Sequence, residues 1–216
     1  MYDNETTRKI QDIINWICIE GQADNCTAAR NYLCASYSTS TKVKTDFDNR
    51  SKIKEEQSKG LKEFAKEHNF LLSKIPTSNK YFAKGGEAKI FLADDGRNVI
   101  KLNSGIYYNT WLDFLNSVLI HNLLFKDSFY VLLGFIDIGN ELFGVLQQSF
   151  IISNEQTNLE NVKNMLEFNG FINTRRNDFF NKELSLILED IHDENVITQN
   201  QTLFFIDTVF YINIVD

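Results

Sequence analysis

The sequence is poor in the features that mark secreted, membrane-spanning and proline-rich chains. It contains one proline and three cysteines in 216 residues, and an odd number of cysteines does not complete a set of disulfide pairs. Its longest apolar stretches, 117–125 and 207–215, run for about nine residues, whereas a membrane-spanning helix needs about 20. The first residues lack the basic and apolar regions of a secretory signal. We therefore expect a soluble protein of the reducing cytoplasm.

Several common catalytic motifs are also missing. The sequence has no Gly-x-Ser-x-Gly, no His-Glu-x-x-His and no Walker Gly-x-x-x-x-Gly-Lys-[Ser/Thr] segment, so hydrolase and P-loop interpretations have no support. Cys18, Cys26 and Cys34 are spaced too widely for the close pairs that usually bind metals. We interpret them as core or surface thiols.

Acidic residues outnumber basic ones along most of the chain. Twenty-nine Asp and Glu against 22 Lys and Arg give a net charge of −7, and the excess lies after residue 80. Nucleic-acid binding depends on Lys and Arg that neutralise phosphates, so this composition does not indicate a nucleic-acid partner. A ligand that carries phosphates would need a metal ion as an intermediary.

The pattern of apolar residues divides the chain at Pro76. Before it, residues 5–70 read as helices, including 24–34 and a charged helix over 46–68. After it, short strands alternate with turns, and the Asp-Asp-Gly at 94–96 predicts a hairpin. The expected elements that follow are a buried helix at 111–125, strands at 130–138 and 141–150, a helix at 158–168, and strands at 184–188, 195–198 and 203–207. We expect an α+β protein with a helical extension at 1–75 and a second domain at 76–216.

An acidic segment near the end of the chain carries the strongest functional signal. Residues 188–197 read Leu-Glu-Asp-Ile-His-Asp-Glu-Asn-Val-Ile, which sets Asp190 at the end of a strand and Asn195 at the start of the next. Residues 204–207, Phe-Phe-Ile-Asp, then end another strand on Asp207. Alone, such a turn is as often merely solvated, and a separate metal centre at 192–194 is the less favoured interpretation. The basic pair at 175–176, in a stretch expected to be irregular, is either a surface loop or an anion contact.

A second set of motifs lies upstream of the acidic segment, between residues 85 and 101. Residues 85–91 read Gly-Gly-Glu-Ala-Lys-Ile-Phe, and 99–101 read Val-Ile-Lys. Glycine lets a backbone approach phosphates closely, and a lysine on the next strand can reach them. A glycine hairpin, a strand lysine, a helix, two strands, Asp-x-x-x-x-Asn and a strand that ends on Asp resemble the protein-kinase-like superfamily. The segments 120–125, 133–135 and 147–151 are most similar to the short kinase-like domains of polyvalent proteins from phages and conjugative elements.

The resemblance implies a fold and a set of roles. The fold is a reduced two-lobe kinase-like domain, with an antiparallel five-stranded sheet and one helix over about 80–150 and a small C-lobe over 151–216. ATP and Mg²⁺ are the implied cofactors. The implied site consists of Asp190 as catalytic base, Asn195 and Asp207 as metal ligands, Lys101 on the phosphates, Gly85 and Gly86 as the lid, and Gln148 to Phe150 as the adenine linker.

The sequence also departs from the kinase pattern. The expected helix 111–125 contains no glutamate to pair with Lys101, and Asp113 or His121 is the available substitute; a buried histidine is more often a core residue. Leu188-Glu189 replaces the usual His-Arg, and Thr208-Val209 replaces Phe-Gly. Two functions follow: a phosphotransferase with an unknown acceptor, or a non-catalytic pseudokinase-type module that binds a nucleotide or a protein. Either the N-terminal helices, 5–70, or a partner chain is expected to support the catalytic loop, and the N-terminal helices are also a possible contact for a protein partner.

Overall fold

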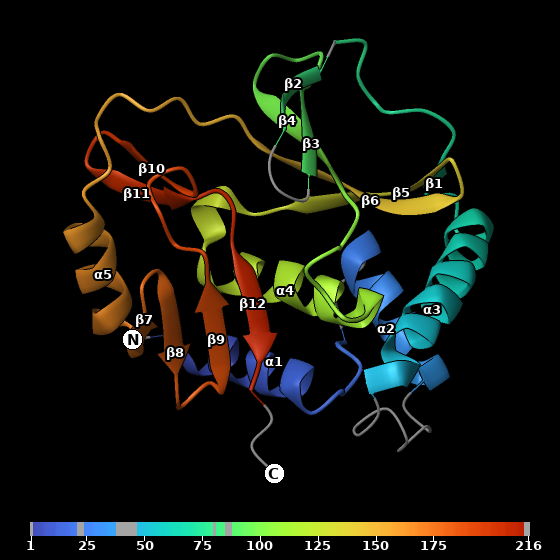
Figure 1. Ribbon diagram of the computed structural model, residues 1–216, viewed down its shortest axis with the longest axis horizontal. Coiled ribbons are helices and arrows are strands. Elements are labelled where there is room, and N and C mark those ends of the chain that lie inside the picture. Colours follow the sequence, from blue (N-terminus) through green and yellow to red (C-terminus); the bar gives the residue numbers. More distant parts are fainter. Residues whose placement is uncertain (1, 21–23, 38–46, 80, 85–87, 214–216) are drawn as a thin grey trace. The chain divides into compact units, whose positions relative to one another are not determined.

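A computed structural model describes residues 2–20, 24–37, 47–79, 81–84 and 88–213 (Figure 1). The helices are α1 (Asn4–Ile14), α2 (Asn25–Tyr37), α3 (Phe47–Glu67), α4 (Trp111–Leu124), the short 3-10 helix η2 (Lys126–Ser128) and α5 (Leu159–Phe168). The helices predicted at 24–34, 46–68, 111–125 and 158–168 are confirmed by α2, α3, α4 and α5. Within the described ranges, no helix combines the length and the apolar character needed to cross a membrane.

The chain divides into two compact units, each assembled from separate stretches of sequence. The sheet unit comprises Trp16–Asn116 and Tyr130–Phe150, and the hairpin unit comprises Met1–Asn15, Ser117–Phe129 and Ile151–Asp216. Consequently α2 and α3 belong to the sheet unit, α1 belongs to the hairpin unit, and α4 contributes residues to both.

The sheet unit is built on a mixed sheet with the strand order β1-β5-β6-β4-β3-β2. These strands are β1 (Leu71–Leu72), β2 (Tyr81–Lys84), β3 (Ala88–Leu92), β4 (Asn98–Asn103), β5 (Val131–Ile138) and β6 (Glu141–Ser149). All neighbours pair in antiparallel fashion except β1, which runs parallel to β5. The prediction of a five-stranded antiparallel sheet therefore missed one strand. The additional strand, β1, has only two residues, which is too short to leave an apolar pattern in the sequence.

Gly134 explains how this extra strand reaches the sheet. It sits at a register shift in β5 with a φ of 154°, a conformation that residues with a side chain rarely adopt. A Cβ at this position would overlap the backbone carbonyl of Phe70, which accepts a hydrogen bond from the N–H of Phe135 at 3.0 Å. The missing side chain thus lets the segment before β1 lie against β5.

The two faces of the sheet carry different neighbours. On one face, Trp111 contacts Phe135 with ring centroids 5.7 Å apart, and Phe114 packs over Gly144. The other face carries an apolar cluster of Ala93, Ile100, Leu102, Ile136, Phe143 and Val145. Because side chains alternate along a strand, Lys101 points to the face of Trp111 and Phe114.

The hairpin unit holds two smaller sheets (Figure 1). One has the order β12-β9-β8-β7, and the other is the hairpin β10-β11. The strands are β7 (Phe171–Arg175), β8 (Asp178–Asn181), β9 (Leu186–Glu189), β10 (Val196–Gln199), β11 (Thr202–Phe205) and β12 (Val209–Ile212). The strands predicted near 184–188, 195–198 and 203–207 are confirmed.

The stretch around the basic pair is not irregular, as the sequence suggested, but forms the hairpin β7-β8. Its turn has neither glycine nor proline. Instead, Arg176 adopts a positive φ of 46°, and the amide of Asn173 donates to the carbonyls of Arg176 and Asp178 over 2.9 and 3.1 Å. A side chain therefore supplies the hydrogen bonds of this turn, which is why the usual turn signals missed it.

Candidate functional site

The acidic segment predicted to be functional forms a closed turn between β9 and β10. Asp190 follows β9 with a positive φ of 64°, and the side-chain nitrogen of Asn195 donates to both its carbonyl oxygen, at 2.8 Å, and its carboxylate, at 3.1 Å. Only the nitrogen side of an amide can face two acceptors, so the side-chain oxygen of Asn195 points the other way. The turn therefore fixes the orientation of both side chains.

The hairpin β10-β11 brings Asp207 to the same place. Val196 pairs with Phe205, which returns the chain to the start of β10. The backbone carbonyl of Asn195 then accepts hydrogen bonds from the N–H groups of Ile206, at 2.9 Å, and Asp207, at 3.3 Å. Asp190, Asn195 and Asp207 are thus held together by contacts within the hairpin unit. In the described part of the chain, no hydrogen bond occupies the carboxylate of Asp207.

His192 is a neighbour of this group that the sequence did not single out as part of it. Its Nδ1 accepts a hydrogen bond from the N–H of Glu194 at 3.2 Å, and its Nε2 lies 3.1 Å from the side-chain nitrogen of Asn195. Nε2 lies 3.4 Å from the carboxylate of Asp190. His192 therefore packs against the turn between Asp190 and Asn195, whereas Asp193 and Glu194 are exposed.

The β7-β8 turn closes the other side of the Asp190 turn. The carboxylate of Asp178 accepts from the N–H of Asp190 at 3.3 Å, and the carbonyl of Asn177 accepts from the N–H of Ile191 at 3.0 Å. Burial raises the pKa of the Glu189 carboxyl, and the charges of Asp178 and Asp190 raise it further. The turn is accordingly a place of concentrated negative charge, which favours a cation.

His121 lies behind this group rather than on its surface. Its side chain is fully buried, with 0% exposure. Nδ1 is 2.7 Å from the hydroxyl of Thr208, the residue after Asp207, and Nε2 is 2.8 Å from the carbonyl of Ser128.

The remaining predicted residues lie in the sheet unit. Lys101 is 5% exposed on β4, between Ile90 and Leu146, with Nζ 5.2 Å from the centroid of the Tyr130 ring. Gln148 is buried on β6. The N–H of Phe150, one of the groups predicted to face adenine, donates to the carbonyl of Arg97 at 2.8 Å. Gly85 and Gly86 lie outside the described residues.

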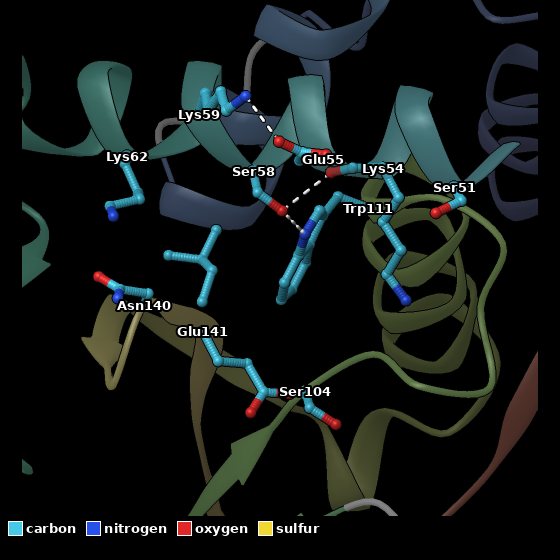
Figure 2. A pocket seen from close by; sticks show the side chains of 11 residues that line it. Ser51, Lys54, Glu55, Ser58, Lys59, Lys62, Ser104, Trp111, Asn140 and Glu141 are labelled. Atoms are coloured by element: carbon cyan, nitrogen blue, oxygen red, sulfur yellow. Dashed lines mark hydrogen bonds and ion pairs between the residues drawn. The ribbon is translucent and has the colours of Figure 1, made fainter. Parts of the chain in front are cut away.

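The sheet unit also contains a cavity that the sequence did not predict. It has a volume of about 590 Å³ and lies beside α3 (Figure 2). Lys54, Ser58, Ser104, Trp111 and Glu141 are among its lining residues, and none of the predicted site residues that the structure describes lines it.

A model of a known protein family matches most of the chain. The model of a family described as serine/threonine/tyrosine kinases found in polyvalent proteins matches residues 54–214. The chain belongs to this family. The match begins inside α3, so the last part of that helix falls within the kinase region. No curated protein and no solved structure matches the chain.

Membership of this kinase family agrees with the resemblance found in the sequence. Kinases transfer a phosphoryl group from ATP with the help of metal ions. The family therefore indicates kinase-like chemistry in general. Among the residues that the structure describes, no three His, Cys, Asp or Glu side chains form a group that could hold a metal ion.

Proposed function

We propose that this kinase-family chain is a Mg²⁺-dependent phosphotransferase that uses ATP, with Asp190 as the base that activates the acceptor. The observation that supports this most strongly is the grouping of Asp190, Asn195 and Asp207 by hydrogen bonds within the hairpin unit. A carboxylate for the acceptor and two oxygen ligands for a metal are the parts that phosphoryl transfer requires.

The donor set suits Mg²⁺. This ion takes oxygen ligands and is usually held by one or two carboxylates together with the phosphates of its substrate. Asp207 offers a carboxylate, and Asn195 offers an amide oxygen that is directed away from Asp190. When bound, the metal would neutralise charge that develops on the phosphates.

In this proposal the sheet unit acts as the nucleotide-holding lobe of a reduced two-lobe kinase-like fold. Lys101 supplies a positive charge from a buried position on β4, which favours contact with the α- and β-phosphates. The backbone of 148–150 faces the adenine in this proposal, apart from the N–H of Phe150, which donates to the carbonyl of Arg97.

Asp190 has a defined task in the reaction. It accepts the proton of an acceptor hydroxyl while the hydroxyl oxygen forms a bond to the γ-phosphorus of ATP. The bond from that phosphorus to the bridging oxygen breaks, and ADP leaves with the electron pair. Asn195, which donates to the Asp190 carboxylate, orients it for this step.

A second function has one specific observation in its favour. Helix α4 contains no glutamate, so the ion pair that positions the strand lysine of active protein kinases cannot form from this helix. A non-catalytic module that binds nucleotide or a protein partner is the alternative.

A measurement of ADP release distinguishes the phosphotransferase from the non-catalytic module. We expect Asp190→Asn to lower the release of ADP from MgATP by about 100-fold or more, the typical contribution of a positioned base, and to keep nucleotide binding. Asp193→Asn, an exposed acid in the same turn, serves as the control and should keep the wild-type rate. A wild-type rate in Asp190→Asn would refute the base, and nucleotide binding without turnover in the native protein would favour the alternative.

A further inference from the structure

The last two turns of α4 and the residues after it hold the segment that contains Asp207. Within the hairpin unit, the hydroxyl of Ser117 accepts from the N–H of Phe210 at 2.9 Å. The hydroxyl of Ser128 donates to the carbonyl of Phe205 at 2.7 Å, and the rings of Phe125 and Phe205 stack with centroids 4.0 Å apart. These contacts fix the chain at Phe205 and Phe210, and none of them involves Asp207 itself or its neighbour Thr208.

The contact nearest to Asp207 is made by His121. The carbonyl of Ser128 can only accept, so Nε2 of His121 carries the ring proton. In the neutral ring, Nδ1 then accepts from the hydroxyl of Thr208, 2.7 Å away. Both hydrogen bonds are buried, where a lost partner is costly, and together they fix the ring and the direction of the Thr208 side chain.

Asp207 consequently lies between two fixed points. Its own N–H donates to the carbonyl of Asn195, and the side chain of the next residue is bound to His121. Each point constrains the backbone on one side of the proposed metal ligand. In the described part of the chain, no hydrogen bond competes for the carboxylate.

We propose that His121, through Thr208, is the positioning residue of the metal ligand Asp207. This inference rests on the proposed function, because it assigns a role only if Asp207 binds the metal. His121 does not touch the nucleotide in this account. The sequence predicted that His121 binds the cofactor; in this account it instead orients the metal ligand. Altering residues that orient metal ligands changes metal affinity by about 10–100-fold.

The test compares variants that remove buried hydrogen bonds from the same segment. Thr208→Val deletes the hydroxyl that meets His121 and keeps the shape of the side chain. Thr208→Ser keeps the hydroxyl. Ser117→Ala removes the bond to Phe210, three residues beyond Asp207, and is the matched control. The measured quantity is the Mg²⁺ concentration that gives half of the thermal stabilisation by a fixed, saturating concentration of ATP.

We expect Thr208→Val to raise this Mg²⁺ concentration about 10-fold or more and Thr208→Ser to restore it. Ser117→Ala should lower the melting temperature without ligand but keep the wild-type Mg²⁺ midpoint. If Thr208→Val is too unstable, His121→Gln offers the same test, since its amide can still donate to the carbonyl of Ser128.

An unchanged Mg²⁺ midpoint in Thr208→Val and His121→Gln, or an equal change in Ser117→Ala, would overturn the positioning role and leave the proposed function standing. A wild-type protein that shows no stabilisation by MgATP would instead overturn the proposed function, and this inference with it.

Discussion

The amide nitrogen of Asn195 donates to both the carbonyl oxygen and the carboxylate of Asp190, five positions earlier in the sequence. The donor side of the amide is thereby occupied, and its oxygen is directed away from Asp190. One residue thus closes the turn and presents an oxygen that suits a metal ion.

Asn195→Ala should therefore have two effects. Removal of the donor leaves the Asp190 turn without its closing hydrogen bonds, at a cost of about 1 kcal/mol in the free energy of unfolding. Removal of the side-chain oxygen should also raise the Mg²⁺ requirement for ATP binding. Denaturant unfolding and a Mg²⁺ titration measure the two effects, and Glu194→Ala, an exposed neighbour, should show neither.

Gln57 on α3 should be important for the stability of the sheet unit. It is 2% exposed, and its side-chain oxygen accepts from the N–H groups of Trp111 and Leu112, the first residues of α4, at 2.8 and 3.2 Å. Gln57→Ala leaves these buried donors without an acceptor, and we expect a loss of about 1–2 kcal/mol in chemical unfolding.

Lys59→Ala provides the control for this prediction. It lies on the same helix but makes only an exposed ion pair with Glu55 (Figure 2), so its stability should stay close to the wild-type value. If Gln57→Ala and Lys59→Ala are equally stable, the hydrogen bonds of Gln57 to the start of α4 do not contribute to stability.

Gly134→Ala should destabilise the sheet unit strongly. The new methyl group would overlap the backbone carbonyl of Phe70, which cannot move without disturbing β1, and the φ of 154° disfavours any side chain. A loss of about 2 kcal/mol or more is expected. Gly139→Ala is the matched control, because it also has a positive φ, 63°, but no atom within 4 Å of the added Cβ. Calorimetry that finds equal losses would contradict the steric account.

Tyr2 should make stability depend on alkaline pH. Its hydroxyl is buried without a hydrogen-bond partner in the described part of the chain, and burial raises its pKa from 10.0 to about 12. The folded protein therefore keeps this proton where the unfolded chain releases it, so the stability contributed by Tyr2 is lost as pH rises from 10 to 12. Tyr2→Phe should reduce this loss and be at least as stable as the wild type at pH 7, as measured by urea unfolding across pH. A steeper alkaline loss in Tyr2→Phe would contradict the account.

The grouping of residues in the candidate site was largely predictable, because spacing along the chain determines it. The Asp-x-x-x-x-Asn turn and the aspartate after the next hairpin follow from short strands with local connections, and local pairs such as Val196 and Phe205 bring them together. The helices and the main strands were predictable from apolar periodicity for the same reason.

The missed features depend on contacts between distant residues or on unusual turns. The parallel strand β1 is two residues long and relies on Gly134, about 60 positions away. The β7-β8 turn uses a positive φ at Arg176 instead of a glycine. The partners of His121, Thr208 and Ser128, come from separate segments, and no sequence period links them. Likewise, nothing in the charged helix predicted at 46–68 indicated that Gln57 contacts the start of α4.

The central claim, that Asp207 helps to bind a nucleotide through a metal, is tested most directly by thermal stability with and without MgATP. At 100 times its dissociation constant, MgATP should stabilise the wild-type protein by about 2.7 kcal/mol. Asp207→Ala should lose this shift, and Asp193→Ala should keep it. The absence of a shift in the wild type, or an undiminished shift in Asp207→Ala, would contradict the account.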